Sequence, residues 1–150
     1  MKIKKVVIIG VGLIGGSIGK ALIKKDSEIE VVGVCRRAVS LEKALNEKAI
    51  SRGTVGELGE AVKGADLVII CTPVNTIKNA MDELANVATS KKLIVTDAGS
   101  TKEDLVRYAN KYKDKFIFVG SHPLAGAEKT GVEFADRDLF KNAVCIVTKT

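Results

Sequence analysis

The sequence predicts an α/β fold in which a doubly wound, mostly parallel sheet lies between two layers of helices, a three-layer α/β/α arrangement. Three observations lead to it. Short apolar runs alternate with helix-like segments along the chain, which is the pattern that builds a parallel sheet. A glycine-rich turn joins the first apolar run to the first helical segment. The length of 150 residues and the hydrophobic content of 46% suit one domain spanning residues 1–150, with no internal repeat or linker.

The expected elements follow from these runs and from the turn residues between them. Strands are expected at residues 6–10, 30–35, 67–72, 93–97, 116–120 and 143–148. Helices are expected at residues 13–25, 40–48, 58–62, 76–87 and 101–111. Ser40 and Ser100 stand at the starts of helical runs and are expected to cap the first N–H groups. Pro73 suits a chain that leaves a strand and immediately begins a helix.

The first strand opens into a Gly-x-Gly-x-x-Gly motif. Gly10 permits a tight turn, Gly12 removes a side chain that would meet a phosphate, and Gly15 lets the next helix lie close to the strand. The main-chain N–H groups at the helix start, including those of Leu13 and Ile14, then face an anion. A motif that follows a strand and opens a helix predicts a Rossmann-type NAD(P)-binding domain.

The same segment has other interpretations. The apolar run behind a Lys-rich start imitates a signal peptide or membrane anchor, but glycines and Lys20 interrupt it. A phosphate-binding P-loop fails on spacing, because Ile14 stands at the required first glycine and Ala21 at the magnesium-binding Ser/Thr. A purely structural glycine turn stays open at this point.

Composition limits the classes of partner and the compartment. The net charge of +6 comes from lysines spread along the chain, with no recognition helix or aromatic platform, so it favours anionic ligands over nucleic acid. Cys35, Cys71 and Cys145 lie in apolar strand-like runs without a Cys-x-x-Cys pair. We therefore expect buried, reduced thiols in a cytoplasmic protein, with no metal site and no membrane segment.

The end of the second strand bears on the choice of cofactor. Cys35 stands about where an acidic residue would bind the adenine ribose of NAD. The next two residues, Arg36 and Arg37, can bind a 2′-phosphate through charge-assisted hydrogen bonds. NADP is therefore favoured over NAD, with ordinary surface arginines as the alternative.

Three further segments end at the edge where ligands bind in such sheets. Cys71, Thr72 and Pro73 are expected to line the route from pyrophosphate to nicotinamide, although packing alone would also explain them. Ser100 is either only a cap or also reaches the crevice. His122, the only histidine, is expected just past a strand in a Gly/Pro-bounded loop, and imidazole suits proton transfer near neutral pH.

Three ordered segments of the chain carry a resemblance to a known family. They are Gly10-Val-Gly-Leu-Ile-Gly-Gly-Ser, Thr96-Asp-Ala-Gly-Ser-Thr-Lys and Gly120-Ser-His-Pro-Leu-Ala-Gly-Ala-Glu-Lys-Thr-Gly. They resemble the motifs of the prephenate and arogenate dehydrogenases of tyrosine biosynthesis, and the last segment is the most specific. The resemblance extends over essentially the whole chain.

The resemblance implies an activity and roles for three residues. The implied reaction is oxidative decarboxylation of prephenate or arogenate with hydride transfer to NAD(P). His122 would accept the proton of the ring hydroxyl, Ser100 would help to position that histidine or the nicotinamide, and Glu128 would lie near the substrate pocket as a gate.

The resemblance also implies what lies outside these 150 residues. Family members carry a helical domain that completes the substrate pocket and forms the homodimer, and that domain is absent here. We therefore expect this chain to bind nucleotide and to turn over little substrate alone. A non-catalytic nucleotide-sensing Rossmann domain is the alternative, and the choice between prephenate and arogenate stays open.

Overall fold

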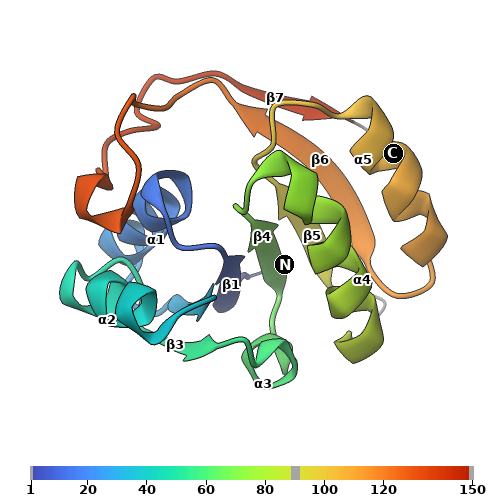
Figure 1. Ribbon diagram of the computed structural model, residues 1–150, viewed down its shortest axis with the longest axis horizontal. Helices are drawn as coiled ribbons and strands as arrows, with labels where there is room; N and C mark the ends of the chain where they lie inside the picture. Colours follow the sequence, from blue (N-terminus) through green and yellow to red (C-terminus); the bar gives the residue numbers. More distant parts are fainter. Residues whose placement is uncertain (1, 89–91, 149–150) are drawn as a thin grey trace.

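A seven-stranded sheet runs through the computed structural model, which describes residues 2–88 and 92–148 (Figure 1). The strands are β1 (Lys5–Ile9), β2 (Glu30–Cys35), β3 (Arg52–Val55), β4 (Leu67–Ile70), β5 (Ile94–Asp97), β6 (Ile117–Pro123) and β7 (Cys145–Thr148). Their spatial order is β3-β2-β1-β4-β5-β6-β7. The first six strands pair in parallel, and β7 pairs antiparallel with β6. The predicted α/β class with a mostly parallel sheet is confirmed.

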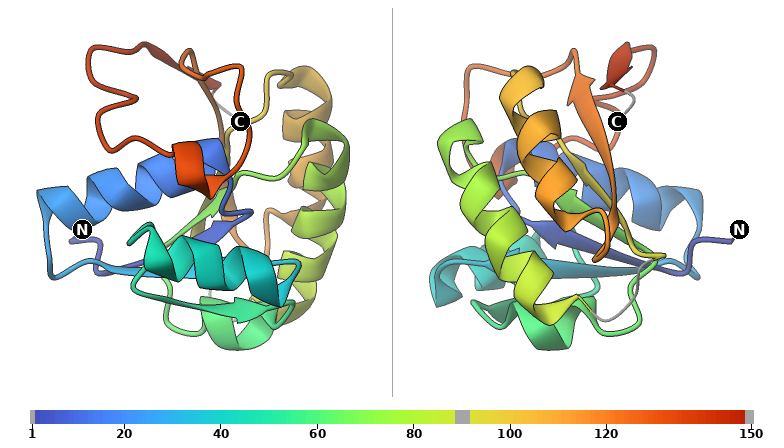
Figure 2. Two further views of the ribbon diagram at one scale, coloured as in Figure 1. Left: turned by 60° about the vertical axis from the view of Figure 1, so that its left-hand side comes forward. Right: turned by 90° about the vertical axis from the view of Figure 1, so that its right-hand side faces the viewer.

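Helices cover both faces of the sheet (Figure 2). They are α1 (Leu13–Lys25), α2 (Ala38–Asn46), α3 (Leu58–Val62), α4 (Ile77–Val87) and α5 (Glu103–Ala109), with 3-10 turns η1 (Val74–Thr76), η2 (Asn110–Tyr112) and η3 (Val132–Phe134). One core cluster joins the sheet to α3, α4 and α5, and the other joins it to α1, α2 and η3.

The central strand β1 shows why the sheet is buried on both faces. Val6 and Ile8 point into one core cluster, whereas Val7 and Ile9 point into the other. Side chains alternate across a strand, so a strand covered on both faces needs a continuous apolar run. Because β1 lies between β2 and β4, the strand order reverses beside it, and the carboxyl end of β1 marks the switch point where ligands bind in such sheets.

Four predictions at the level of elements were wrong. The strand β3 was missed, because its Arg-Gly-Thr-Val sequence carries no apolar run and none of its residues is fully buried. The predicted caps are also wrong: Ser40 lies inside α2 behind the boundary residue Arg37, and Ser100 lies before Lys102, which borders α5. His122 lies within β6, not in a loop, because pairing with Ile146 of β7 continues the strand past Gly120.

The cysteines divide by environment. All three are free thiols. Cys35 is buried, Cys71 is partly exposed and Cys145 is exposed, so the expectation of three buried thiols holds in full only for Cys35 and was wrong for Cys145. That residue starts β7, which is the outermost strand of the sheet on that side among the described residues. Within residues 2–88 and 92–148, no helix has the length and hydropathy to cross a membrane.

Candidate functional site

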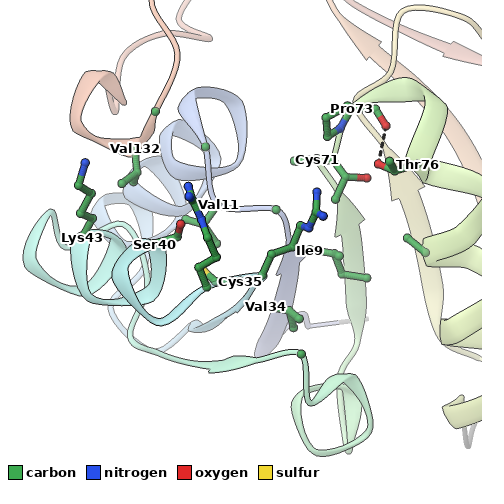
Figure 3. Close-up of a pocket in the computed structure, with 18 of the residues that line it drawn as sticks. Ile9, Val11, Val34, Cys35, Ser40, Lys43, Cys71, Pro73, Thr76 and Val132 are labelled. Carbon is green, nitrogen blue, oxygen red and sulfur yellow. Dashed lines mark hydrogen bonds between the residues drawn. The ribbon is translucent and has the colours of Figure 1, made fainter.

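A cavity of about 1010 Å³ opens at the carboxyl ends of β1, β2 and β4 (Figure 3). Its walls come from the turns after these strands, from α2 and α4, and from residues 130–133. Seven of the predicted cofactor residues line it: Gly10, Gly12, Arg36, Arg37, Cys71, Thr72 and Pro73. The structure thus brings the ends of three strands, far apart in the sequence, to one hollow.

The glycine turn fits the shape of this hollow. Gly10 has a φ of +90°, and its N–H donates to the carbonyl of Val34 at 3.0 Å. A Cβ at Gly15 would lie 2.3 Å from the carbonyl oxygen of Gly10, so only glycine lets α1 approach the turn this closely. A Cβ at Gly12 would meet no atom within 4 Å. Gly12 therefore faces open space at the N-terminus of α1, where an anion is favoured.

Two other predicted residues lie beside this turn. Leu13 and Ile14 form the first residues of α1, and neither lines the cavity. What they offer a ligand is the main-chain N–H groups of the first helical turn, which have no partner within the helix.

Charged side chains surround the cavity at the end of β2. Arg36, Arg37 and Lys43 face it together with Glu83 and Glu133. Lys43 Nζ lies 3.2 Å from a carboxylate oxygen of Glu133. The main-chain N–H of Glu133 and, after it, Lys43 hold the pKa of the Glu133 carboxyl below its ordinary value. Among the described residues, neither arginine pairs with a carboxylate, so both guanidinium groups are available to an anionic ligand.

The turn after β4 supplies the opposite wall. Burial and, secondarily, the charge of Asp97 raise the pKa of the Cys71 thiol to about 12, which keeps it protonated at neutral pH. The hydroxyl of Thr72 is buried and has no hydrogen-bond partner among the described residues. The carbonyl of Pro73 accepts both the hydroxyl and the N–H of Thr76 at 2.8 Å, which shapes the start of α4.

Several lining residues were missed from the sequence. Ser40 and Lys43 lie three residues apart on α2, and this spacing on a helix after β2 could have placed both on the cavity side. Val132 and Glu133 gave no local signal, and Thr130 and Gly131 stood out only as the end of the segment that carries the family resemblance. All four reach the cavity because Val132 is buried against α1 and α2, and because the N–H of Asp136 donates to the buried hydroxyl of Ser17 at 2.9 Å.

The three residues proposed for the reaction lie apart from this cavity. His122 is in β6, Ser100 is exposed between β5 and α5, and Glu128 is exposed after β6. None of them lines the cavity, and no hydrogen bond joins His122 to either of the others within residues 2–88 and 92–148. Across the same described ranges, no group of three or more His, Cys, Asp or Glu side chains could hold a metal ion.

Comparison with known proteins decides the family. A family profile described as "Prephenate dehydrogenase, nucleotide-binding domain" matches residues 18–150. The chain belongs to the prephenate dehydrogenase family. A prephenate dehydrogenase of Lactococcus lactis subsp. cremoris is 38% identical over 97% of this chain and 41% of its own length. The chain therefore spans about two fifths of that relative.

Solved structures of the family agree with the fold. The prephenate dehydrogenase of A. aeolicus, in complex with hydroxyphenyl propionate and NAD+, superposes with a TM-score of 0.90 at 32% identity. That superposition covers 100% of this chain and 52% of the other. The arogenate dehydrogenase of Synechocystis gives a TM-score of 0.88 at 29% identity over 97% of this chain and 50% of its own. The predicted family and the predicted Rossmann-type fold are confirmed.

Proposed function

We propose that this chain is the cofactor-binding half of a dehydrogenase that converts prephenate, or arogenate, by oxidative decarboxylation. The observation that carries the proposal is the cavity at the switch point, with open space over Gly12 at the start of α1. The family supplies the reaction class, since the relatives are dehydrogenases. Because the chain spans only part of those relatives, the activity of the whole protein belongs to the proposal.

The cavity has features that suit a dinucleotide. The pyrophosphate would lie over Gly12 and accept hydrogen bonds from the N–H groups of Leu13 and Ile14, while Gly15 holds α1 close behind. The buried hydroxyl of Thr72 would gain the partner that it lacks. When bound, the nicotinamide supplies the acceptor for the hydride.

NADP is the cofactor that the end of β2 favours. An acidic residue there would hydrogen-bond the ribose of NAD and repel a 2′-phosphate, but Cys35 occupies the end of the strand. Arg36 and Arg37 line the cavity without carboxylate partners among the described residues, so they can take the phosphate. The A. aeolicus relative was solved with NAD+, so this preference is proposed as a property of the present chain.

His122 is the proposed catalytic base. It would accept the proton of the substrate hydroxyl as the hydride leaves the same carbon, and the oxidised ring would then lose carbon dioxide and become aromatic. Ser100 is proposed to help to position the histidine or the nicotinamide, and Glu128 is proposed to lie near the substrate pocket as a gate. Holding the reacting carbon beside the nicotinamide in a dry site contributes the orientation that such a reaction needs.

The remaining parts of the proposal concern the rest of the protein. The extra length of the relatives is where we place the completion of the substrate pocket and the homodimer contact. A cytoplasmic location accords with three unpaired thiols.

An activity assay tests the proposed reaction. The full-length protein that contains this chain would be mixed with prephenate or arogenate and with NADP or NAD, and the absorbance of reduced cofactor would be followed. We expect turnover with one of the two substrates, faster with NADP. Cofactor binding without turnover on either substrate would instead favour the nucleotide-sensing alternative.

A further inference from the structure

A buried ion pair joins the ends of β5 and β6 to the start of α5. Asp97, the last residue of β5, has a fully buried side chain, and its carboxylate pairs with the Nζ of Lys102, whose side chain is only 12% exposed. Neither residue lines the cavity. Burying two charges is costly, and well-packed apolar side chains of similar volume often stabilise a fold as much as a buried ion pair does. A buried carboxylate with fixed donors is better suited to defining the direction of the main chain.

The donors to this carboxylate come from two separate segments. One oxygen of Asp97 accepts the main-chain N–H of Ser121 at 3.2 Å, and the other accepts that of Gly99 at 2.9 Å. The hydroxyl of Ser121 donates to the main-chain oxygen of Asp97 at 2.6 Å and receives the hydroxyl of Thr96 at 3.1 Å. The β5–β6 ladder ends at the pair Thr96 and Val119. Beyond it, these side-chain contacts of Asp97 and Ser121 hold the two strands together.

The surrounding backbone leaves room for the pair. A Cβ at Gly99 would lie 2.9 Å from a carboxylate oxygen of Asp97. A Cβ at Gly120 would lie 3.1 Å from Cδ of Lys102. Glycines therefore occupy two positions where the main chain approaches the ion pair closely, Gly99 beside Asp97 and Gly120 beside Lys102. A larger residue at either position would crowd one partner of the pair.

The position of the pair connects the cavity with the proposed base. Asp97 pairs with Ile70 of β4 in the sheet, and Ile70 directly precedes Cys71, a cavity-lining residue. On its other side Asp97 holds Ser121, the residue directly before His122. The last β5–β6 pair is at Val119 and the β6–β7 pairs run from Gly120 to Pro123, so Ser121 and His122 lie where β6 has left β5 and pairs with β7.

We propose that Asp97 and Lys102 are positioning residues, which fix the Ser121–His122 segment of β6 in a defined place relative to the cofactor cavity. The relevance of this placement to the reaction rests on the proposed role of His122. Neither residue touches the reacting atoms in this proposal. Their effect passes through the main chain of Ser121 to the imidazole beside it.

The single histidine makes the proposal directly measurable by NMR on this chain. The imidazole of His122 gives one set of signals, because the sequence has no other histidine. We would compare the wild type with Asp97→Asn and with the double variant Asp97→Asn/Lys102→Met, which removes both charges and so avoids an unpaired buried ion. The matched control is Asp66→Asn. Asp66 directly precedes β4, and its carboxylate also accepts main-chain N–H groups, from Lys4 at 2.7 Å and from Lys5, the first residue of β1, at 3.0 Å.

We expect the His122 signals to shift in both Asp97 variants and to stay in place in the control. In the full-length protein, kcat should fall by about 10- to 100-fold, as for a misplaced reacting group, while the dissociation constant of NADP changes by less than about twofold. Unshifted His122 signals in the folded double variant would overturn the proposal, as would a loss of NADP affinity with unchanged kcat. If the His122 signals shift but His122→Asn leaves kcat unchanged, the positioning holds and the proposed catalytic role fails.

Discussion

The two ends of the carboxyl edge of this sheet differ in how far the described residues enclose a site. At the switch point, β1, β2 and β4 enclose a cavity with a glycine turn, free arginines and a buried hydroxyl that lacks a partner within the described residues. At the other end, β6 carries His122, and a series of exposed apolar side chains lies on β7 and in the residues next to β6 and β7. These are Leu124, Val144, Ile146 and Val147, which are 49–63% exposed. The nucleotide end is built from this chain, whereas the end that carries the proposed base is open to solvent.

The difference separates two kinds of function within one domain. A nucleotide site at a switch point needs only strand ends and a helix N-terminus, which a single sheet supplies. A site for a small acid needs enclosure, because orientation and exclusion of water contribute much of the rate. The proposal therefore assigns binding to this chain and turnover to the longer protein. The predictions below test the two ends, and the first also measures whether a change at one end affects the other.

The largest expected effect is at the β6 end. Replacing His122 with Asn in the full-length protein should lower kcat by roughly 10²–10⁴-fold, because the substitution removes the general base. The affinity for NADP, measured by titration, should not change, since His122 does not line the cavity. A kcat that stays near that of the wild type would exclude His122 as the base. A parallel loss of NADP affinity would show that the two ends are not separate.

A pair of glycine substitutions tests the nucleotide end. Gly12→Ala should change the free energy of unfolding by less than about 0.5 kcal/mol, because its Cβ meets nothing, and should weaken NADP binding by about 10-fold or more. Gly15→Ala should cost about 1–3 kcal/mol of stability, since its Cβ would press on the carbonyl of Gly10. Denaturant unfolding and calorimetry measure the two quantities. Unchanged NADP binding in Gly12→Ala would mean that the diphosphate does not lie in the space over this residue.

The arginines sharpen the choice of cofactor. Replacing Arg36 and Arg37 together with Ala should weaken NADP by about 10- to 100-fold through loss of charge-assisted hydrogen bonds, and NAD by less than about twofold. The matched control is Arg52→Ala, since Arg52 pairs with Glu30 on the neighbouring strand and does not line the cavity. Equal losses of affinity for NADP and NAD would mean that the arginines attract both anionic cofactors without recognising the 2′-phosphate. No loss of affinity for either would mean that they are ordinary surface charges.

Thiol labelling gives the smallest expected effect and leaves the fold intact. At about pH 8 a thiol reagent should modify the exposed Cys145 at least about 10-fold faster than Cys35 and Cys71. Burial raises the pKa of both slow thiols, that of Cys71 to about 12, so their labelling should accelerate as the pH rises toward that value. Mass spectrometry of the labelled peptides identifies the order. Fast labelling of Cys71 at neutral pH would mean that the wall of the cavity opens in solution.

Local sequence signals predicted the elements that are buried and regular. The run Val6–Ile9, the glycine turn and the bounds of α1 and α3 follow from apolar patterning and from backbone requirements that only glycine meets. The edge strand β3 has no such pattern, because its pairing with β2 is a tertiary contact. His122 looked like a loop residue because Gly120 and Pro123 flank it, whereas its strand depends on β7, more than twenty residues later.

The same distinction applies to the site. Residues at strand ends, such as Arg36 and Thr72, can be placed at the switch point from their position in the sequence alone. Residues 130–133 reach the cavity only because Val132 packs on α1 and Ser17 accepts the N–H of Asp136. The Asp97–Lys102 pair likewise joins segments that come together only in the folded sheet. No local pattern in the chain marks these contacts.

Calorimetric titration of this chain with NADP and with NAD tests the central claim most directly, because it requires neither substrate nor the rest of the protein. The account predicts saturable binding at one site, tighter for NADP than for NAD. The absence of saturable heat with both nucleotides, on protein shown to be folded, would contradict it.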